Sequence, residues 1–457
     1  MKYSSPHNPR ASLKRRFAKA ASWVLIGQFT GNLFRLGGNL ILARLMAPDA
    51  FGIMAVAGVI HVIVALLADI GLRQAVIQSP NGERHSFLDT AWTLQILRGL
   101  LIWAACIIAS LGLRVAEAWT LFSPNSVYAN SILPAMVFAV SFSAVINGFQ
   151  SMKGVSANRA IDLKHITIIE MIAQISSLCL AIGLSWLTGS VWSFVASGLF
   201  SSLTSTTLSH AWLKGRRDRI AWDREALSEF ARFGRWVFVS SLFYVLATNG
   251  DRLLLGAWAT PAMLGYYSIA FALTNVFDSV AARLFGSVSM PALSEIARSE
   301  PQRLPRLFWR MRAPFDVVFI ALAGFLFAAG PSIVAFLYDA RYSSAGSVLS
   351  LLSLGLLFSR YNIVIYVYLA LGFPKYQSIV NAVRAASLFL LVPMLYSFFG
   401  FNGAVLGVAC HPLLTLPLIF WFNSKHGLNN LFLEVSVLAA WPIGWGFGYC
   451  LTNLLQA

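Results

Sequence analysis

The stretch SWVLIGQFTGNLFRLGGNLILA, residues 22–43, is long and apolar enough to span a bilayer, yet it carries Arg35 near its middle. A hydrocarbon core of about 30 Å requires about 20 apolar residues in a helix. A charge near the centre of that core costs roughly 2.5–3.5 kcal/mol on insertion scales. Arginines recur inside the later apolar stretches, and the full set is Arg35, Arg98, Arg252, Arg283, Arg360 and Arg384. The sequence therefore predicts a membrane protein that uses intramembrane arginines.

The composition indicates a polytopic, all-α membrane protein. The 457 residues are 58% hydrophobic and 11% charged, whereas soluble domains carry about 25% charged residues. The net charge of +16 is concentrated in short segments between apolar stretches, as at a cytoplasmic membrane face. We therefore expect membrane lipid as a partner and no nucleic acid. The four cysteines lie in apolar segments without metal-ligand spacing, so we expect no disulfide, no metal and no cofactor.

Apolar segments of about 20 residues predict the membrane-spanning helices. We place them at 22–43, 53–71, 88–112, 129–149, 166–187, 190–212, 234–257, 263–291, 312–337, 346–371, 377–398 and 402–423, with 431–454 as a candidate thirteenth. With the N-terminus inside, 25 of the 34 Lys and Arg residues lie on the inner side and 3 lie outside. This asymmetry predicts a cytoplasmic N-terminus. The C-terminus lies outside if 431–454 spans the membrane and inside if it lies flat. The charged link 213–232 is expected to form a cytoplasmic amphipathic helix.

An internal repeat divides the chain. After a shift of 213 positions, FAKAASWV (17–24) aligns with FARFGRWV (230–237), Pro48 with Pro261, and Gly52 with Gly265. We therefore predict two six-helix halves around a central cavity, residues 1–212 and 213–423, followed by an additional hydrophobic helix in 424–457. Because six is even, both halves enter the membrane in the same orientation, as a parallel repeat. The alternative is chance similarity between two amphipathic helix entries.

The intramembrane charges are the candidate functional residues. A guanidinium binds phosphate through two parallel hydrogen bonds and stays charged when partly buried, so we predict that the six arginines bind an anionic substrate. The structural alternative is that they reach the interface or pair with acids on neighbouring helices. Three embedded acids, Glu170, Asp251 and Asp278, are candidates for coupling transport to H⁺ or Na⁺. Residues one apart do not share a helix face, so Asp251 is less suited to be the local partner of Arg252.

The sequence contains no recognisable catalytic pattern. The longest predicted outer loop, about 113–128, carries only Arg114 and Glu117 as charges. There is no Gly-rich phosphate loop, no DxD pair of carboxylates and no Ser/His/Asp grouping. We therefore expect no catalytic residues and no enzyme activity. A membrane enzyme of polysaccharide assembly, such as a polymerase or ligase, is the alternative from a different class.

Several longer stretches form an ordered set of motifs. The first half contains ILARLMAPDAFGIMAVAGV (41–59), LADIGLRQAVIQ (67–78) and RAIDLKH (159–165). The second half contains FARFGRWVF (230–238), NGDRLLLGAW (249–258), LGYYSIAFAL (264–273), MPALSEI (290–296) and LGFPKY (371–376). Together these motifs resemble the bacterial polysaccharide flippases of the multidrug/oligosaccharidyl-lipid/polysaccharide exporter superfamily. They occur in order over almost the whole chain and are most similar to the exopolysaccharide, Wzx-like branch, the PST family.

The resemblance implies a two-bundle flippase fold that works by alternating access. It also implies an undecaprenyl-diphosphate-linked oligosaccharide as substrate, moved across the inner membrane for exopolysaccharide, capsule or O-antigen synthesis. Because the repeat already forms a complete transporter, we expect a monomer. We also expect an association with the polysaccharide assembly machinery. Members of this branch often end with a further pair of helices, whereas only 431–454 follows the core here. A cation-coupled multidrug exporter of the same superfamily and a peptidoglycan-precursor flippase stay as alternatives.

Overall fold

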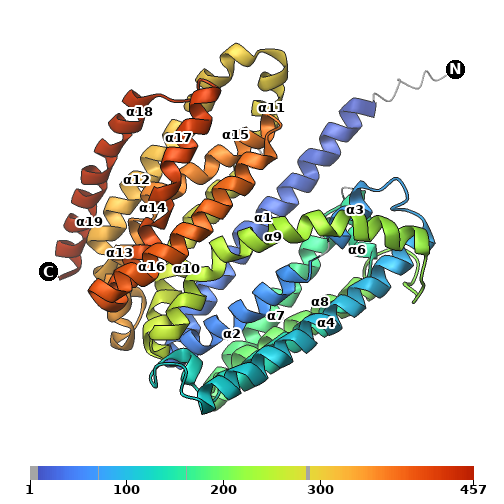
Figure 1. Ribbon diagram of the computed structural model, residues 1–457, viewed down its shortest axis with the longest axis horizontal. Coiled ribbons are helices and arrows are strands. Elements are labelled where there is room, and N and C mark those ends of the chain that lie inside the picture. The colour runs from blue at the N-terminus through green and yellow to red at the C-terminus, as the bar shows by residue number, and fades with distance from the viewer. Residues whose placement is uncertain (1–8, 70, 161, 285–288, 457) are drawn as a thin grey trace. The chain divides into compact units, whose positions relative to one another are not determined.

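The computed structural model describes residues 9–69, 71–160, 162–284 and 289–456, and these residues are built from helices without strands (Figure 1). The first part of the chain forms α1 (Pro9–Leu45), α2 (Pro48–Leu67), α3 (Leu72–Gln78), α4 (His85–Ala118), η1 (Val127–Ala129), α5 (Leu133–Gly148), α6 (Lys153–Arg159), α7 (Lys164–Thr188) and α8 (Trp192–Ala211).

The second part begins with α9 (Arg224–Trp258), α10 (Pro261–Leu284), α11 (Met290–Ser299), η3 (Pro301–Arg303), α12 (Leu304–Leu337), η4 (Ala340–Tyr342) and α13 (Ser344–Ser353). It continues with α14 (Leu356–Ser359), η5 (Arg360–Ile363), α15 (Val364–Ala370), α16 (Pro374–Cys410), η6 (His411–Thr415), α17 (Leu416–Lys425), α18 (Leu431–Ser436), η7 (Val437–Ala439) and α19 (Ala440–Gln456).

All of the predicted spans coincide with helical structure where they are described. Among the described residues, seven helical segments are long and apolar enough to cross a membrane, and α5 with α6 makes an eighth if that pair, bent by 67°, counts as one span. The segment 374–425 contains two predicted spans, 377–398 and 402–423. The other predicted spans lie in α1, α8, α9 and α10. The prediction 263–291 runs past the end of α10 into residues 285–288, which lie outside the described part of the chain.

The chain packs as two compact units. The first contains residues 9–38, 64–110 and 135–239, and the second contains 39–63, 111–134 and 240–456. In the first unit α7 packs along α8, and in the second α12 packs along α19 and α13 (Figure 1). The units are divided differently from the halves expected from the repeat, which stay a prediction.

Residues that correspond in the repeat contact one another within the second unit. A Cβ atom placed on Gly52 would collide with the carbonyl oxygen of Pro261, and one placed on Gly265 would collide with the carbonyl oxygen of Pro48. The contact is reciprocal, since each glycine faces the proline of the other copy. Glycine at both positions therefore allows the first turns of α2 and α10 to approach backbone to backbone.

Three of the sequence predictions about helices differ from the structure: one helix end, one uninterrupted span and one link. The helix 53–71 ends at Leu67, because Gly71 adopts φ 65° and its N–H donates to Asp69 Oδ1 at 3.1 Å. The span 346–371 is interrupted by the 3-10 turn η5. The prediction of an amphipathic helix over the whole link 213–232 is wrong for its first part, since regular helix begins only at Arg224 and Gly215 has φ 148°. A side chain other than glycine is strained at that φ, which favours an irregular connection.

A break in the helix separates the last two predicted core spans. Gly400 has φ 60° and ψ −145° inside α16. This backbone conformation is open to glycine and strained for other residues. The predicted boundary between 377–398 and 402–423 falls at this residue.

Candidate functional site: buried and unpaired charges within each unit

Arg98 on α4 holds the break between α2 and α3. Its Nη1 lies 3.2 Å from Asp69 Oδ1, and its Nη2 donates to the carbonyl oxygen of Ala65 at 2.9 Å. About a quarter of the side chain is exposed (27%), and its buried Nε has no hydrogen-bond partner. Arg98 is therefore partly neutralised, with donor capacity left on the guanidinium.

Arg35 on α1 differs from Arg98 in its surroundings. It is exposed, and its Nη2 donates to Asn32 Oδ1 at 2.7 Å, one turn earlier in the same helix. No acid lies within ion-pairing distance of Arg35 among the residues the structure describes. An amide oxygen orients the guanidinium without cancelling its charge. Arg35 is thus the sequence-predicted arginine of the first unit that keeps its full charge.

A polar cavity of about 130 Å³ lies in the first unit. Glu170, predicted as a coupling residue, lines it together with Arg73. The wall also contains Gln95 and Gln150, and the Gln150 amide donates to Ser205 Oγ at 3.1 Å. Opposite charges and amides therefore share one cavity. The sequence analysis does not single out Arg73 or either glutamine; Arg73 and Gln150 lie just beyond the ends of predicted spans, and Gln95 is an uncharged residue within one.

Asp251 on α9 is buried in the second unit, with 4% of its surface exposed. The Tyr267 hydroxyl on α10 donates to its Oδ2, while the buried Oδ1 has no hydrogen-bond partner. Arg252, the next residue, instead places its guanidinium 4.4 Å from the centre of the Phe271 ring. Asp251 therefore bonds to a different helix, and one of its oxygens keeps its capacity to accept a proton or a cation.

Asp278 and Arg384 belong to a second polar group in this unit. Ser359 donates to Asp278 Oδ2 at 3.2 Å. Arg384 Nη1 donates to Asn362 Oδ1 at 3.0 Å, and its Nε lies 3.4 Å from Nε2 of His411. Arg384 and Asp278 interact through their charges without direct contact. The side chain of Arg283 lies outside the described residues.

Four charges form a buried cluster around Arg360. Its Nη1 lies 3.2 Å from Asp316 Oδ2, and its Nη2 lies 3.1 Å from Glu434 Oε2. Arg312 contacts the same two acids, at 3.1 Å and 2.7 Å. The Tyr361 hydroxyl donates to Glu434 Oε2 at 2.8 Å. The guanidinium of Arg360 thus has one acid at each end. The two positive and two negative charges of the cluster balance.

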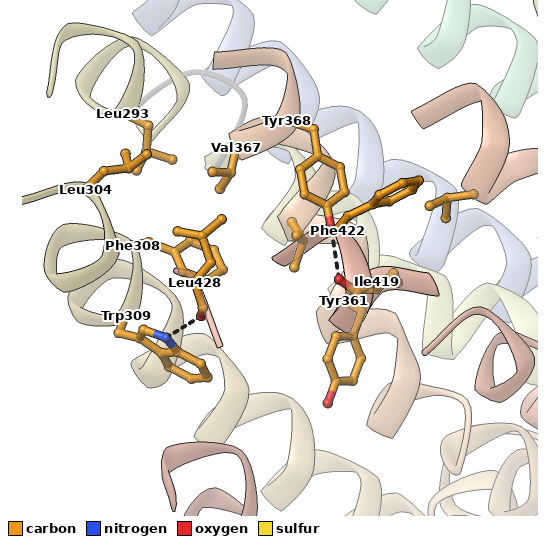
Figure 2. Close-up of a cluster of buried hydrophobic side chains, with 12 residues drawn as sticks. Leu293, Leu304, Phe308, Trp309, Tyr361, Val367, Tyr368, Ile419, Phe422 and Leu428 are labelled. Atoms are coloured by element: carbon orange, nitrogen blue, oxygen red, sulfur yellow. Dashed lines mark hydrogen bonds between the residues drawn. The ribbon is translucent and has the colours of Figure 1, made fainter. Parts of the chain in front are cut away.

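Aromatic side chains enclose one side of this cluster. Figure 2 shows Phe308, Trp309 and Tyr361 in an apolar group whose members come from α11, α12, η5, α15, α16 and the α17 region. The Arg312 guanidinium lies 4.8 Å from the Trp309 ring centre and 4.7 Å from that of Tyr361. Arg312 is completely buried. The cluster therefore sits in surroundings of low polarity, where its pairings are strong and each unpaired charge would be costly.

Sequence reasoning found one of these four charges. The sequence analysis predicts Arg360, whereas Arg312 is not among its candidate arginines, and Asp316 and Glu434 are not among its embedded acids. A signal was present, because Arg312 and Asp316 are four residues apart and so share one helix face. The Glu434 pairing joins residues 122 positions apart and leaves no local pattern.

Comparison with known proteins supplies the family. The family model described as polysaccharide biosynthesis protein matches residues 41–347. A Klebsiella pneumoniae protein named "Uncharacterized membrane protein in cps region" is 21% identical over 303 residues, covering 66% of this chain and 60% of that protein. "Lipopolysaccharide biosynthesis protein WzxC" of Escherichia coli is 20% identical over 343 residues, covering 75% and 67%. The chain thus spans about three fifths to two thirds of these relatives.

Solved structures supply the fold. The chain matches "Lipid II flippase MurJ, inward closed conformation" with a TM-score of 0.67 at 15% identity, over 94% of this chain and 95% of that one. It matches an inward-facing MATE family transporter of the MOP superfamily with a TM-score of 0.63 at 13% identity, over 94% and 98%. The fold is therefore that of the MOP-superfamily transporters. Since the family model covers more than half of the sequence, the chain belongs to the polysaccharide biosynthesis protein family of multi-pass membrane proteins.

Proposed function

We propose that this protein flips an undecaprenyl-diphosphate-linked oligosaccharide from the cytoplasmic to the periplasmic leaflet of the bacterial inner membrane. The oligosaccharide serves exopolysaccharide, capsule or O-antigen synthesis. Family membership carries the proposal. The names of WzxC and of "Succinoglycan biosynthesis transport protein ExoT" from Rhizobium meliloti, 19% identical over 324 residues, support it. So does the fold shared with a lipid II flippase.

Intramembrane arginines bind the diphosphate in this proposal. Arg35 is the strongest candidate, because it is exposed and has an amide as its partner. Arg98 is next, since a quarter of it is exposed and its Nε is free of hydrogen bonds. Arg252 and Arg384 serve the second unit, along with Arg283. Arg360 acts differently, because two carboxylates already hold its guanidinium in a buried cluster.

Embedded acids couple the transport to an ion in this proposal. Asp251 combines deep burial with an oxygen that has no hydrogen-bond partner, which suits a group that binds H⁺ or Na⁺ during the cycle. Asp278, held by one serine hydroxyl, is the second candidate. Glu170 lines the polar cavity of the first unit and is the third.

The remaining parts of the proposal concern orientation, partners and chemistry. The N-terminus is cytoplasmic, as the distribution of Lys and Arg predicts. The protein works as a monomer by alternating access, in association with the polysaccharide assembly machinery. It moves its substrate without chemical change and is not an enzyme.

The decisive experiment locates the lipid-linked oligosaccharide. The gene is deleted in a host strain that also lacks the polymerase, and the leaflet that holds the lipid-linked oligosaccharide is determined. We expect accumulation in the cytoplasmic leaflet, relieved by the wild-type gene and not by Arg35→Ala. Normal delivery to the periplasmic leaflet in the deletion strain would refute the proposal, and export of cationic drugs would then be measured.

A further inference from the structure

The segment 212–223 between α8 and α9 has no regular structure, yet its backbone is firmly held. The N–H groups of alternate residues 219, 221 and 223 donate to Asp89, Thr93 and Thr90 of α4, at 3.1, 3.1 and 3.0 Å. These acceptors are buried side chains on one face of the first turns of α4. Because every second N–H faces α4, the segment runs in an extended form along that helix.

A buried carboxylate, that of Asp218, anchors the middle of the segment. Asp218 accepts a hydrogen bond from Ser151 Oγ at 2.6 Å and one from the Met152 N–H at 3.2 Å. Its side chain is 6% exposed. Arg216 pairs with Asp89 at 3.4 Å. These hydrogen bonds and this ion pair hold the segment against the first unit.

The segment also carries large apolar side chains that are exposed. Ile220 is 72% exposed, Trp222 is 59% exposed and Trp212 is 50% exposed. Ile220 and Trp222 are two residues apart and so share one face of an extended segment. Tryptophan is enriched where protein meets the headgroup region of a bilayer, because its ring is apolar and its N–H is polar.

Cations without partners lie beside these apolar side chains. Arg217, Arg219 and Arg224 are exposed, and none lies within ion-pairing distance of an acid in the part of the chain that the structure describes. Three acids lie nearby: the side chain of Asp218 is 6% exposed, Asp223 accepts a hydrogen bond from the Glu225 N–H at 3.0 Å, and Glu225 pairs with Arg84 at 3.2 Å. Exposed arginines therefore alternate along the extended segment with exposed isoleucine and tryptophan, and positive charge lies on the face next to the apolar one.

We propose that segment 212–224 is a binding site for anionic phospholipid headgroups. The arginines contact lipid phosphates, while Trp222 and Ile220 enter the headgroup region. The segment begins where the predicted span 190–212 ends, so its first end adjoins the membrane surface in this proposal. Juxtamembrane cations bind anionic leaflets in this way, whereas a site for an acidic soluble protein would not need two large apolar side chains.

Titration with phosphatidylglycerol tests the proposal on the full-length protein in detergent. Native mass spectrometry measures the bound lipid for the wild type and for Arg217→Gln/Arg219→Gln/Arg224→Gln. The matched control is Arg298→Gln/Arg306→Gln/Arg310→Gln, which removes three exposed arginines from α11 and α12, none of them within ion-pairing distance of a described acid. We expect the affinity for phosphatidylglycerol to fall by about fivefold for each arginine removed from the segment, and to stay near the wild-type value in the control.

Two results would overturn the proposal. The first is an equal change in both triple variants, which would mean that lipid binding follows total charge and not this segment. The second is unchanged lipid binding by the segment variant together with lost polymer export in cells, which would indicate a protein partner at this site. A second variant, Ile220→Ser/Trp222→Ser, keeps all three arginines and is expected to lower the amount of phosphatidylglycerol bound in the same titration. Neither measurement depends on flipping, so the flippase proposal is tested separately.

Discussion

At the scale of single residues, the balance of charge decides what each intramembrane arginine can do. Arg35 has an amide partner, Arg98 has one partly exposed acid, and Arg360 has two buried acids. Removing one member of a buried ion pair leaves an uncompensated charge and is strongly destabilising, whereas removing both members together is often tolerated. The same substitution therefore has different consequences at these three positions.

Removal of one carboxylate from the buried cluster is expected to unfold the protein more easily. Glu434→Gln leaves Arg312 and Arg360 with only Asp316 as an acid partner, which should cost about 3–5 kcal/mol. The measurement is thermal unfolding of the purified protein in detergent. Glu434→Gln combined with Arg360→Met restores neutrality and should recover part of the loss. Unfolding of Glu434→Gln at the wild-type temperature would contradict the assignment of a tight cluster.

Arg98 is expected to act on the substrate as well as on Asp69. Arg98→Ala should abolish polymer export while leaving the protein in the membrane, and Arg98→Lys should impair export because lysine lacks the planar two-point contact. Asp69→Asn is the informative control, because it removes the acid and keeps the guanidinium. Export lost equally in Asp69→Asn and Arg98→Ala would mean that Arg98 serves only to hold the break after α2.

At the scale of elements, close backbone contact joins α12 to α19. A Cβ atom on Gly444 would collide with the carbonyl oxygen of Ala321, and one on Gly324 would collide with that of Trp441. Gly446, on the same helix as Gly444, has nothing within 4 Å of its Cβ position. Gly444 and Gly446 thus form a matched pair, one in the helix contact and one outside it.

Gly444→Ala is expected to destabilise the protein by about 1–3 kcal/mol, because the methyl group must force the two backbones apart. Gly446→Ala should be neutral or slightly stabilising, since alanine favours helix over glycine. Thermal unfolding of both variants in detergent gives the comparison. Equal unfolding temperatures would show that α19 does not pack on α12 at this distance.

The turn between α12 and α13 is expected to respond weakly to acid. The side chain of Arg341 hydrogen-bonds Asp339 and holds the pKa of that carboxyl below its ordinary value. Arg341 also donates to the carbonyl oxygens of Ala43 and Arg44 at the end of α1, at 3.3 Å and 2.9 Å. Because the pKa is lowered on folding, the pair contributes stability above the unfolded pKa of about 3.9 and loses it as the pH falls through the lowered value.

Asp339→Asn should remove this contribution, which is below about 1 kcal/mol because the pair is largely exposed. The measurement is the unfolding temperature of wild type and variant between about pH 6 and pH 3, in the range set by the unfolded pKa. The difference between them should shrink at the acid end. A difference that grows as the pH falls would contradict the sign of the shift.

At the scale of the whole molecule, the direction of the last helix bears on the side of the C-terminus. Gly444 meets Ala321 and Gly448 meets Phe325, so contacts advance by four residues along both helices. Further along, Ser332 donates to Thr452 at 3.2 Å. α19 therefore runs parallel to α12 over most of its length, and residues 431–454 are long and apolar enough to cross a membrane.

The C-terminus is accordingly expected on the outer side. With a cytoplasmic N-terminus, α12 runs outward, and a helix parallel to it ends outside. Fusion of alkaline phosphatase, which is active only outside the cytoplasm, to residue 456 should give active enzyme, while a fusion in the turn after α17 should not. Activity in the second fusion and not in the first would reverse the predicted topology.

The sequence by itself determined the class of the protein, the positions of its helices and the family to which it belongs. These rest on local properties, since hydropathy over about 20 residues, breaks at glycine and proline, and ordered motifs are all read along the chain. It also identified Arg360 and Asp251 as charges that need an explanation. Only the tertiary structure decided their partners, because Glu434, Asp316 and Tyr267 reach them from other helices. Charge neutralisation depends on distances in space, and residues far apart along the chain leave no sequence pattern that reports those distances.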